Sequence, residues 1–329
     1  YATAPKAYYD AITGWFRRRH GWQIRPEWVL HTTGVIPALS AVIKALTQPG
    51  DKVLIQTPVY NHFFTSIHNS GCQAAESPLV YRDNTYTIDF DDLERKAADP
   101  AVKLMLLCNP HNPAGRVWTP AELHRIGELC LRHDVVVVAD EIHCELVMPG
   151  FRYTPFASLC EEFERRSVTC TSPSKAFNLA GLQVANIFAA DAALRARIGH
   201  SLQINETGEI GPFAIEALIA AYDEGAEWLD ALNEYLHGNY RFSREYFDRN
   251  LPQYPVLPLE GTYLVWVDCR ASGLTSDELE TKLLEEAKLR INPGAIYGEA
   301  GRDFIRLNIA CPRKLLAEGL DRLRKVLKR

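Results

Sequence analysis

The sequence predicts an α/β protein whose large domain contains a mainly parallel sheet, followed by a smaller α+β domain. From about residue 30 to 190, short apolar segments alternate with segments of helical periodicity. Strands that alternate with helices form a mostly parallel sheet covered on both faces. From Phe213 to about Leu251 the pattern is helical, and after Pro252 strands and helices alternate again. We therefore expect a large domain at 1–235 and a small one at 236–329, joined within a helix near 228–240.

Local sequence signals predict the individual helices and strands of both domains. A helix is expected at 36–46, because Pro49-Gly50 stops it and Thr32-Thr33-Gly34 precedes it. Another begins at Thr119-Pro120, where an N-cap threonine precedes a proline in the first helical position. The run 135–139 is apolar on both faces, as in a central parallel strand. Further strands are expected at 52–56, 101–108, 167–172, 184–190, 261–268 and 304–309, and further helices at 275–288 and 313–327.

Composition excludes several classes of protein. The chain has 329 residues, of which 47% are hydrophobic and 23% charged, so it is neither disordered nor collagen-like. A net charge of −5 provides no basic surface for nucleic acid and no polybasic membrane anchor. No apolar run reaches the ~18 residues that span a bilayer. We expect a soluble protein with neither nucleic acid nor membrane as a partner.

Eight cysteines are scattered along the chain, and none forms a C-x-x-C pair. Several lie in apolar segments, as Cys108 and Cys170 do. Such cysteines are typical of buried, reduced thiols in a cytosolic protein, so we expect a cytoplasmic location. Their spacing predicts neither a disulfide framework nor a metal site.

Polar motifs follow four of the predicted strands. Each motif alone is typical of a turn, a helix cap or a solvated side chain. Functional residues in open α/β sheets gather at the carboxyl ends of strands, so the four together indicate one site. The motifs are Thr57-Pro58-Val59-Tyr60, Asn109 to Gly115, Asp140-Glu141-Ile142-His143 and Ser172-Pro173-Ser174-Lys175.

With these motifs the chain resembles the fold-type I pyridoxal-phosphate (PLP) enzymes, the aspartate aminotransferase superfamily. It is most similar to the MalY/PatB group of cystathionine β-lyases. The resemblance runs from Tyr1 to the last helix and implies a PLP-dependent transferase fold with a mostly parallel, mixed seven-stranded sheet. The segments that carry it are Asn109-Pro-His-Asn-Pro-Ala-Gly-Arg-Val-Trp118, Asp140-Glu-Ile-His-Cys-Glu-Leu146, Ser172-Pro-Ser-Lys-Ala-Phe-Asn-Leu-Ala-Gly-Leu-Gln183 and Arg306-Leu-Asn-Ile-Ala-Cys-Pro312.

The resemblance implies catalytic roles for Lys175, Asp140 and Tyr60. Lys175 matches the lysine that binds the PLP aldehyde and later acts as a base. Asp140 matches the acid that keeps the pyridine nitrogen protonated, which makes the ring an electron sink. Tyr60 matches the aromatic residue that stacks on the ring. Asn112 matches the residue that donates a hydrogen bond to the phenolic oxygen of PLP. It is also assigned to substrate binding.

The resemblance also implies a phosphate site. The family places the phosphate at Gly34, Val35 and Ile36, where backbone amides open a helix. The hydroxyls of Ser172 and Ser174 can add donors. Tyr1 aligns with a tyrosine that reaches the phosphate of the neighbouring subunit, so we expect a homodimer. In this alignment the family's N-terminal segment, part of the small domain, is missing.

Arg306 matches the arginine that binds the substrate α-carboxylate. An arginine within the apolar run 304–307 is costly unless it is paired, which independently favours a function. Two positions depart from classical aminotransferases, which have a tyrosine and an arginine where this chain has His143 and Gln183. His143 is expected near the phenolic oxygen or as a packed neighbour of the site. Both departures also occur in the lyase-like group.

These assignments predict C–S β-elimination from a cysteine derivative such as L-cystathionine, giving thiol, pyruvate and ammonia. An aminotransferase is the first alternative, because both reactions use the same residues until the Cα proton is removed. A regulatory binding protein on the same fold is the second, since some members of the group modulate a transcriptional activator. Intact Lys175, Asp140, Asn112 and Arg306 argue against a purely non-catalytic role.

Overall fold

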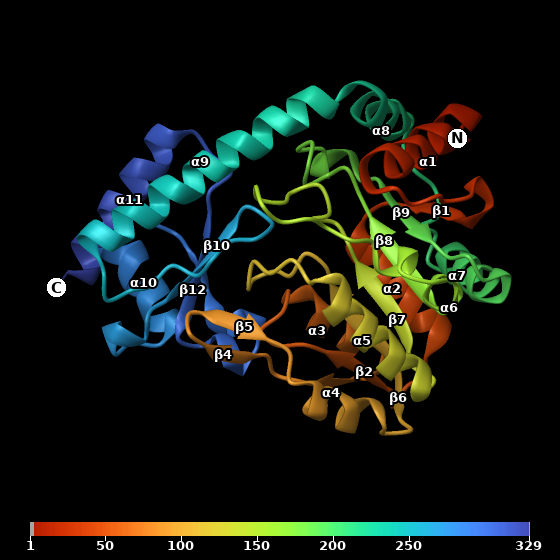
Figure 1. Cartoon of the computed structure of the whole chain (residues 1–329), viewed down its shortest axis with the longest axis horizontal. Coiled ribbons are helices and arrows are strands. Elements are labelled where there is room, and N and C mark those ends of the chain that lie inside the picture. Colours follow the sequence, from red (N-terminus) through yellow and green to blue (C-terminus); the bar gives the residue numbers. More distant parts are fainter. Residues whose placement is uncertain (1–2, 329) are drawn as a thin grey trace.

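A seven-stranded sheet forms the centre of the larger part of the protein (Figure 1). The computed structural model describes residues 3–328. Only β9 runs against its neighbours β1 and β8, and the other pairs are parallel. This arrangement confirms the mostly parallel mixed sheet. The strand order is β1 (Val29–Thr32), β9 (Ala185–Phe188), β8 (Ser167–Thr171), β7 (Val136–Asp140), β6 (Val102–Cys108), β2 (Lys52–Ile55), β3 (Gln73–Glu76).

Alternate residues of the central strands face two different cores. Leu104 and Leu106 of β6 belong to the core that contains α2. Met105 and Leu107 belong to the opposite core, which contains α5. Burial on both faces explains why these strands read as continuous apolar runs. The helices of this part are α1 (Lys6–His20), α2 (Val35–Leu46), α3 (His62–Asn69), α4 (Phe90–Ala97), α5 (Pro120–Arg132), α6 (Glu161–Arg165), α7 (Ala192–Ile204) and α8 (Pro212–Glu224).

The long helix α9 (Ala226–Asn250) runs from this part to a smaller one around a three-stranded antiparallel sheet (Figure 1). That sheet has the order β10 (Leu264–Asp268), β12 (Phe304–Asn308), β11 (Asn292–Pro293), and α10 (Ser276–Ala287) and α11 (Arg313–Leu327) pack against it. The expected boundary at 235/236 falls inside α9 and stays a prediction. A two-stranded hairpin comprises β4 (Val80–Arg82) and β5 (Thr85–Thr87).

Short 3-10 helices connect several elements: Pro26–Trp28, Phe156–Ser158, Ala180–Leu182, Arg270–Ser272, Gly294–Tyr297 and Glu299–Gly301. Within residues 3–328, no helix has both the length and the apolar character needed to cross a membrane.

Most of the predicted elements are present, with ends that differ by a few residues. Thr119 caps α5 as expected, in a capping box with Glu122. The predicted helical run from 213 to 251 is interrupted at Gly225, where a Cβ would overlap the Ala221 carbonyl oxygen and the Phe177 ring. The strand predicted at 261–268 begins only at Leu264.

A substitution at Gly294 tests how the strand that carries Arg306 is held. A Cβ on this buried glycine would overlap the carbonyl oxygens of Gly301 and Phe304. Gly294→Ala should therefore lower the free energy of unfolding by about 1–3 kcal/mol, as overpacking does. Gly199→Ala is the control, because it has open space on α7 and should stabilise the helix by about 0.5–1 kcal/mol. Equal urea midpoints for the two variants would contradict this prediction.

Candidate active site

A cavity of about 310 Å³ lies where the carboxyl ends of β6, β7 and β8 meet the amino end of α2 and the smaller sheet. It brings together residues from all four strand-end motifs. Tyr1 lies outside the described residues. The predicted site residues that line the cavity are Gly34, Val35, Ile36, Tyr60, Asn112, Asp140, His143, Ser172, Ser174, Lys175 and Arg306.

Asp140 ends β7 and is only 4% exposed. Its Oδ1 accepts a hydrogen bond from the Ile142 amide at 3.2 Å, and it forms no ion pair with the described residues. Burial raises the pKa of Asp140 to about 7, although the Ile142 amide and the charge of Lys175 act in the opposite direction. A protonated nitrogen placed against this carboxylate would supply the missing opposite charge.

Lys175 follows β8 in a turn that Ser172 shapes. Ser172 Oγ donates to the Val184 carbonyl at 2.6 Å and accepts from the Ser174 amide at 3.1 Å. The Ser172 proton is therefore already used, whereas the Ser174 hydroxyl makes no hydrogen bond with residues 3–328. Lys175 also has neither a hydrogen bond nor an ion pair among those residues, and its amine is free to react in the cavity.

The first turn of α2 offers backbone donors. Gly34 is its N-cap and has no side chain to cap the helix, so the first amides have no side-chain acceptor. Val35 and Ile36 line the cavity here. Uncapped amides at a helix start, together with the helix dipole, form an anion site.

Arg306 reaches the cavity from β12, where it lies between Trp266 of β10 and Asn292 of β11. Its Nη1 donates to Asn112 Oδ1 at 2.9 Å and its Nη2 to Asn292 Oδ1 at 3.2 Å. The guanidinium also lies over the Tyr297 ring, 4.8 Å from the ring centroid.

No acid pairs with Arg306 among the described residues, and its buried Nε has no hydrogen-bond partner. Burial lowers the pKa of Arg306, while the neighbouring tyrosines act in the opposite direction. Its only hydrogen-bond acceptors among residues 3–328 are thus two neutral amides. The guanidinium is therefore available to a carboxylate from a ligand.

Three aromatic side chains line the cavity: Tyr60, His143 and Tyr263. The His143 ring meets the Tyr263 ring edge-on, with centroids 5.9 Å apart. Burial, reinforced by Lys175 and Arg306, lowers the pKa of His143 to about 3, so the imidazole is neutral. Its Nδ1 is buried and has no hydrogen-bond partner among the described residues.

Sequence reasoning missed Tyr263, as well as Thr33, Cys108 and Asn308. Tyr263 lies just before β10 in the smaller part of the chain, far from the four strand-end motifs, and no local signal marks it. Gln183, which stood out only as a departure from classical aminotransferases, also lines the cavity and has a left-handed backbone with φ 54°.

This donor set fits a phosphorylated pyridine aldehyde. An unpaired buried carboxylate suits a protonated ring nitrogen, and an unpartnered lysine suits an aldehyde. An uncapped helix start suits a phosphate. The arginine remains for a substrate carboxylate.

The family described as "Aminotransferase class I and II" matches residues 3–323. The chain belongs to this family. "Cystathionine beta-lyase PatB" of Bacillus subtilis is 43% identical over 99% of this chain and 84% of its own length. "Protein MalY" of Escherichia coli is 35% identical over 94% of this chain and 79% of its own.

A solved structure of a related protein has the same fold. Cystalysin from Treponema denticola, whose crystal structure contains pyridoxal 5'-phosphate, superposes with a TM-score of 0.98. It is 36% identical and matches all of this chain and 83% of its own. The resemblance to the MalY/PatB group and the fold expected from it are thereby confirmed.

The raised pKa of Asp140 makes stability depend on pH in cofactor-free protein. Between its ordinary value of 3.8 and about 7, the folded state keeps a proton that the unfolded state has released. Asp140 therefore costs stability progressively as pH rises through this window. Between pH 5 and pH 8, the free energy of unfolding of Asp140→Asn should rise by up to about 3 kcal/mol relative to that of wild type.

Denaturant unfolding of the two proteins at both pH values measures this difference. The exposed Asp223→Asn should give a pH profile parallel to that of wild type. A constant gap between Asp140→Asn and wild type would contradict the assignment.

Proposed function

We propose that this chain is a PLP-dependent carbon–sulfur β-lyase. It removes the thiol from a cysteine derivative such as L-cystathionine and forms pyruvate and ammonia. The observation that carries the proposal is the cavity in which Asp140, Lys175 and Arg306 meet without ion-pair partners among the described residues. The names of the relatives PatB and cystalysin, the second solved with PLP, support the reaction class and the cofactor.

Each part of the cofactor has a proposed partner. Lys175 binds the aldehyde, Asp140 faces the ring nitrogen, and the Asn112 amide donates to the phenolic oxygen. Tyr60 stacks on the ring, and His143 lies near it as a neutral side chain. The amides of Val35 and Ile36 after Gly34 bind the phosphate together with Ser174, while Ser172 holds the turn.

When bound, PLP supplies a protonated ring that accepts the electron pair left after Cα loses its proton. Arg306 orients the substrate by binding its α-carboxylate through a planar pair of N–H donors. The Lys175 amine, which lines the same cavity, would take the Cα proton of the substrate. Asp140 stays ionised because it faces a positive charge.

The leaving group on Cβ determines the fate of the substrate once its Cα proton is gone. A thiolate departs readily from Cβ because its thiol has a pKa of ~8.5 in cysteine itself. The resulting enamine is hydrolysed to pyruvate and ammonia. A substrate that lacks a leaving group on Cβ can only be reprotonated, which is the aminotransferase course.

An aminotransferase on the same scaffold remains the alternative, because the family as a whole carries that description. To separate the two, the purified protein is incubated with L-cystathionine or with L-alanine plus a keto acid. We expect stoichiometric pyruvate and free thiol from cystathionine and only slow conversion of alanine. Brisk exchange between alanine and the keto acid, without thiol from cystathionine, would reverse this order.

Loss of the Lys175 amine should remove both the covalent bond to PLP and the base. In Lys175→Ala, borohydride treatment should leave no cofactor attached to the denatured chain. The rate of β-elimination should fall at least ~1,000-fold, which lies within the range for the loss of an acid–base group. Lys103→Ala, at an exposed position on β6, should behave as wild type. Persistent covalent PLP in Lys175→Ala would mean that another lysine binds the aldehyde.

Arg306→Lys tests the carboxylate site. A lysine keeps the charge but loses the planar pair of donors. Since the carboxylate is bound before and during the reaction, KM should rise roughly 10–100-fold with a smaller change in kcat. Arg302→Lys, on an exposed side chain, is the matched control. An unchanged KM would exclude Arg306 from substrate binding.

We further propose that the protein is a homodimer in the cytoplasm, in which Tyr1 reaches the partner's phosphate site. Exposed apolar side chains around α7, α8 and α9 support a subunit contact; among them are Ile204 and Phe213, which are 68% and 80% exposed. The mass in solution by light scattering tests this assembly. Residues 1–235 and 236–329 are proposed as its two domains.

A further inference from the structure

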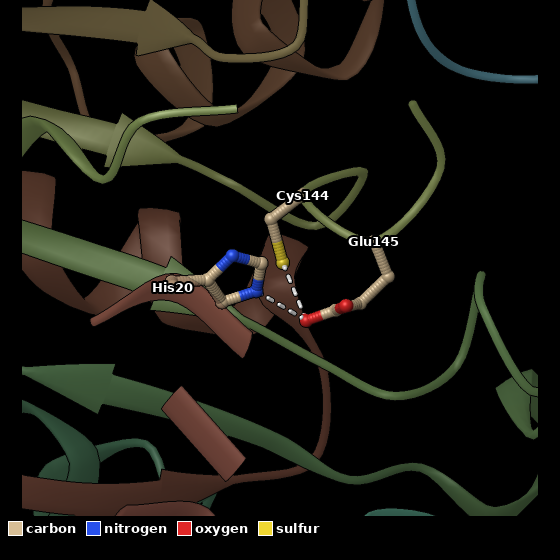
Figure 2. A group of neighbouring side chains, drawn as sticks. All are labelled: His20, Cys144 and Glu145. Carbon is tan, nitrogen blue, oxygen red and sulfur yellow. Dashed lines mark hydrogen bonds and ion pairs between the residues drawn. The ribbon is translucent and has the colours of Figure 1, made fainter. Parts of the chain in front are cut away.

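His20, Cys144 and Glu145 form a cluster outside the catalytic cavity (Figure 2). His20 ends α1, while Cys144 and Glu145 lie in the turn after β7. One potential metal-binding atom from each residue lies within 4.8 Å of the other two. Figure 2 shows the three side chains pointing toward one another. An imidazole, a thiol and a carboxylate are the ligand types that zinc takes in proteins.

Among the described residues, only one oxygen of the Glu145 carboxylate has hydrogen-bond partners. Its Oε1 accepts from Trp15 Nε1 at 2.6 Å and lies 2.7 Å from His20 Nε2. Cys144 Sγ lies 3.7 Å from the same oxygen. Glu145 is only 7% exposed, yet its buried Oε2 has no hydrogen-bond partner among the described residues.

The surroundings fix the geometry of these groups. Trp15 holds Glu145 Oε1, and Asn233 Nδ2 donates to the Glu145 backbone oxygen at 2.9 Å. Such outer contacts orient metal ligands and leave little to reorganise on binding. The His20 ring packs edge-on against Tyr153, with centroids 4.9 Å apart.

A second cavity, of about 470 Å³, opens beside the cluster. His20, Cys144 and Glu145 all line it, together with residues from α9 such as Asn233 and Glu234. The cavity gives an ion a route from solvent and leaves room for a water ligand. Zinc sites with three protein ligands keep a fourth position for water.

Charged side chains of both signs line this second cavity: Arg18, Arg19 and Arg152 are positive, and Glu145, Asp230 and Glu234 are negative. The nearest cation is Arg19, whose Nε lies 3.9 Å from Glu145 Oε2. Arg19 is also paired with Asp230 at 2.8 Å. It therefore keeps an acidic partner when Glu145 binds an ion. One thiolate and one carboxylate would balance the two charges of a zinc ion.

We propose that the chain binds one Zn²⁺ through His20 Nε2, Cys144 Sγ and one carboxylate oxygen of Glu145, with water in the fourth position. The ion displaces the Cys144 proton, which passes to solvent, and binds a nitrogen lone pair of the His20 imidazole. It ties the end of α1 to the turn that also carries His143. The site is structural, and it is independent of the proposed β-lyase reaction.

Metal analysis of the PLP-loaded protein tests the site. After dialysis against equimolar Zn²⁺, we expect one zinc per chain and a higher melting temperature than in chelator-treated protein. X-ray absorption at the zinc edge should show one sulfur at ~2.3 Å, with nitrogen and oxygen at ~2.0–2.2 Å. The sulfur neighbour distinguishes this site from zinc held by surface histidines or by the cofactor.

Cys144→Ser keeps a hydrogen-bonding hydroxyl but removes the sulfur ligand. It should lose the zinc–sulfur signal and bind zinc at least tenfold more weakly. Cys160→Ser changes a partly exposed free thiol elsewhere and should match wild type. If Cys144→Ser does not fold, His20→Gln, which can still donate to Glu145, should show the same loss of affinity.

Several results would overturn the proposal. One is wild-type protein that retains no zinc and melts at the same temperature with and without chelator. Another is bound zinc without a sulfur neighbour. A third is equal zinc affinity in wild type and in the folded Cys144 or His20 variant. In each case the cluster is a hydrogen-bonded group that holds α1 in place.

Discussion

The rest of the structure depends on three charged side chains that line one cavity. None of the three has an ion-pair partner among the described residues. Asp140, Lys175 and Arg306 line the same space, and none lies within ion-pair distance of an opposite charge among the described residues. Burial raises the pKa of Asp140 to about 7, which measures how unfavourable its unpaired charge is. Apolar cores on both faces of the sheet supply the stability that offsets this cost. A ligand with a protonated nitrogen and a carboxylate would supply the opposite charges that Asp140 and Arg306 lack among the described residues.

The two parts of the chain meet at one hydrogen bond within the site. Arg306 belongs to the smaller sheet, while Asn112 follows β6 of the larger one, and their side chains are joined at 2.9 Å. Asn292 and Tyr297 hold the other side of the guanidinium. The position of the Arg306 guanidinium in the cavity therefore depends on the placement of β12 against the large sheet. Within the smaller part, Gly294 lies so close to Gly301 and Phe304 that a Cβ on it would overlap their carbonyl oxygens.

The sequence was sufficient to predict the residues whose chemistry is costly in their local context. Arg306 interrupts an apolar strand and stands out by itself, whereas Asp140 and Lys175 stood out only because four strand-end motifs occur together and resemble those of a known family. The direction of β9 was not readable, because an apolar run buried on both faces looks the same in either orientation. Tyr263 was missed because only the packing of the smaller sheet brings it to the cavity. His20 and Cys144 lie far apart in the chain, and no spacing rule connects them.

The composition of the cavity bears on the choice between elimination and transamination. Apart from Asp140, Lys175 and Arg306, the described residues that line it are uncharged, and a low pKa keeps His143 neutral. In the proposed function, the three charged groups act on features that every α-amino acid shares once it reaches the cofactor. The course of the reaction therefore depends on whether Cβ carries a group that leaves without help, and a thiolate is such a group.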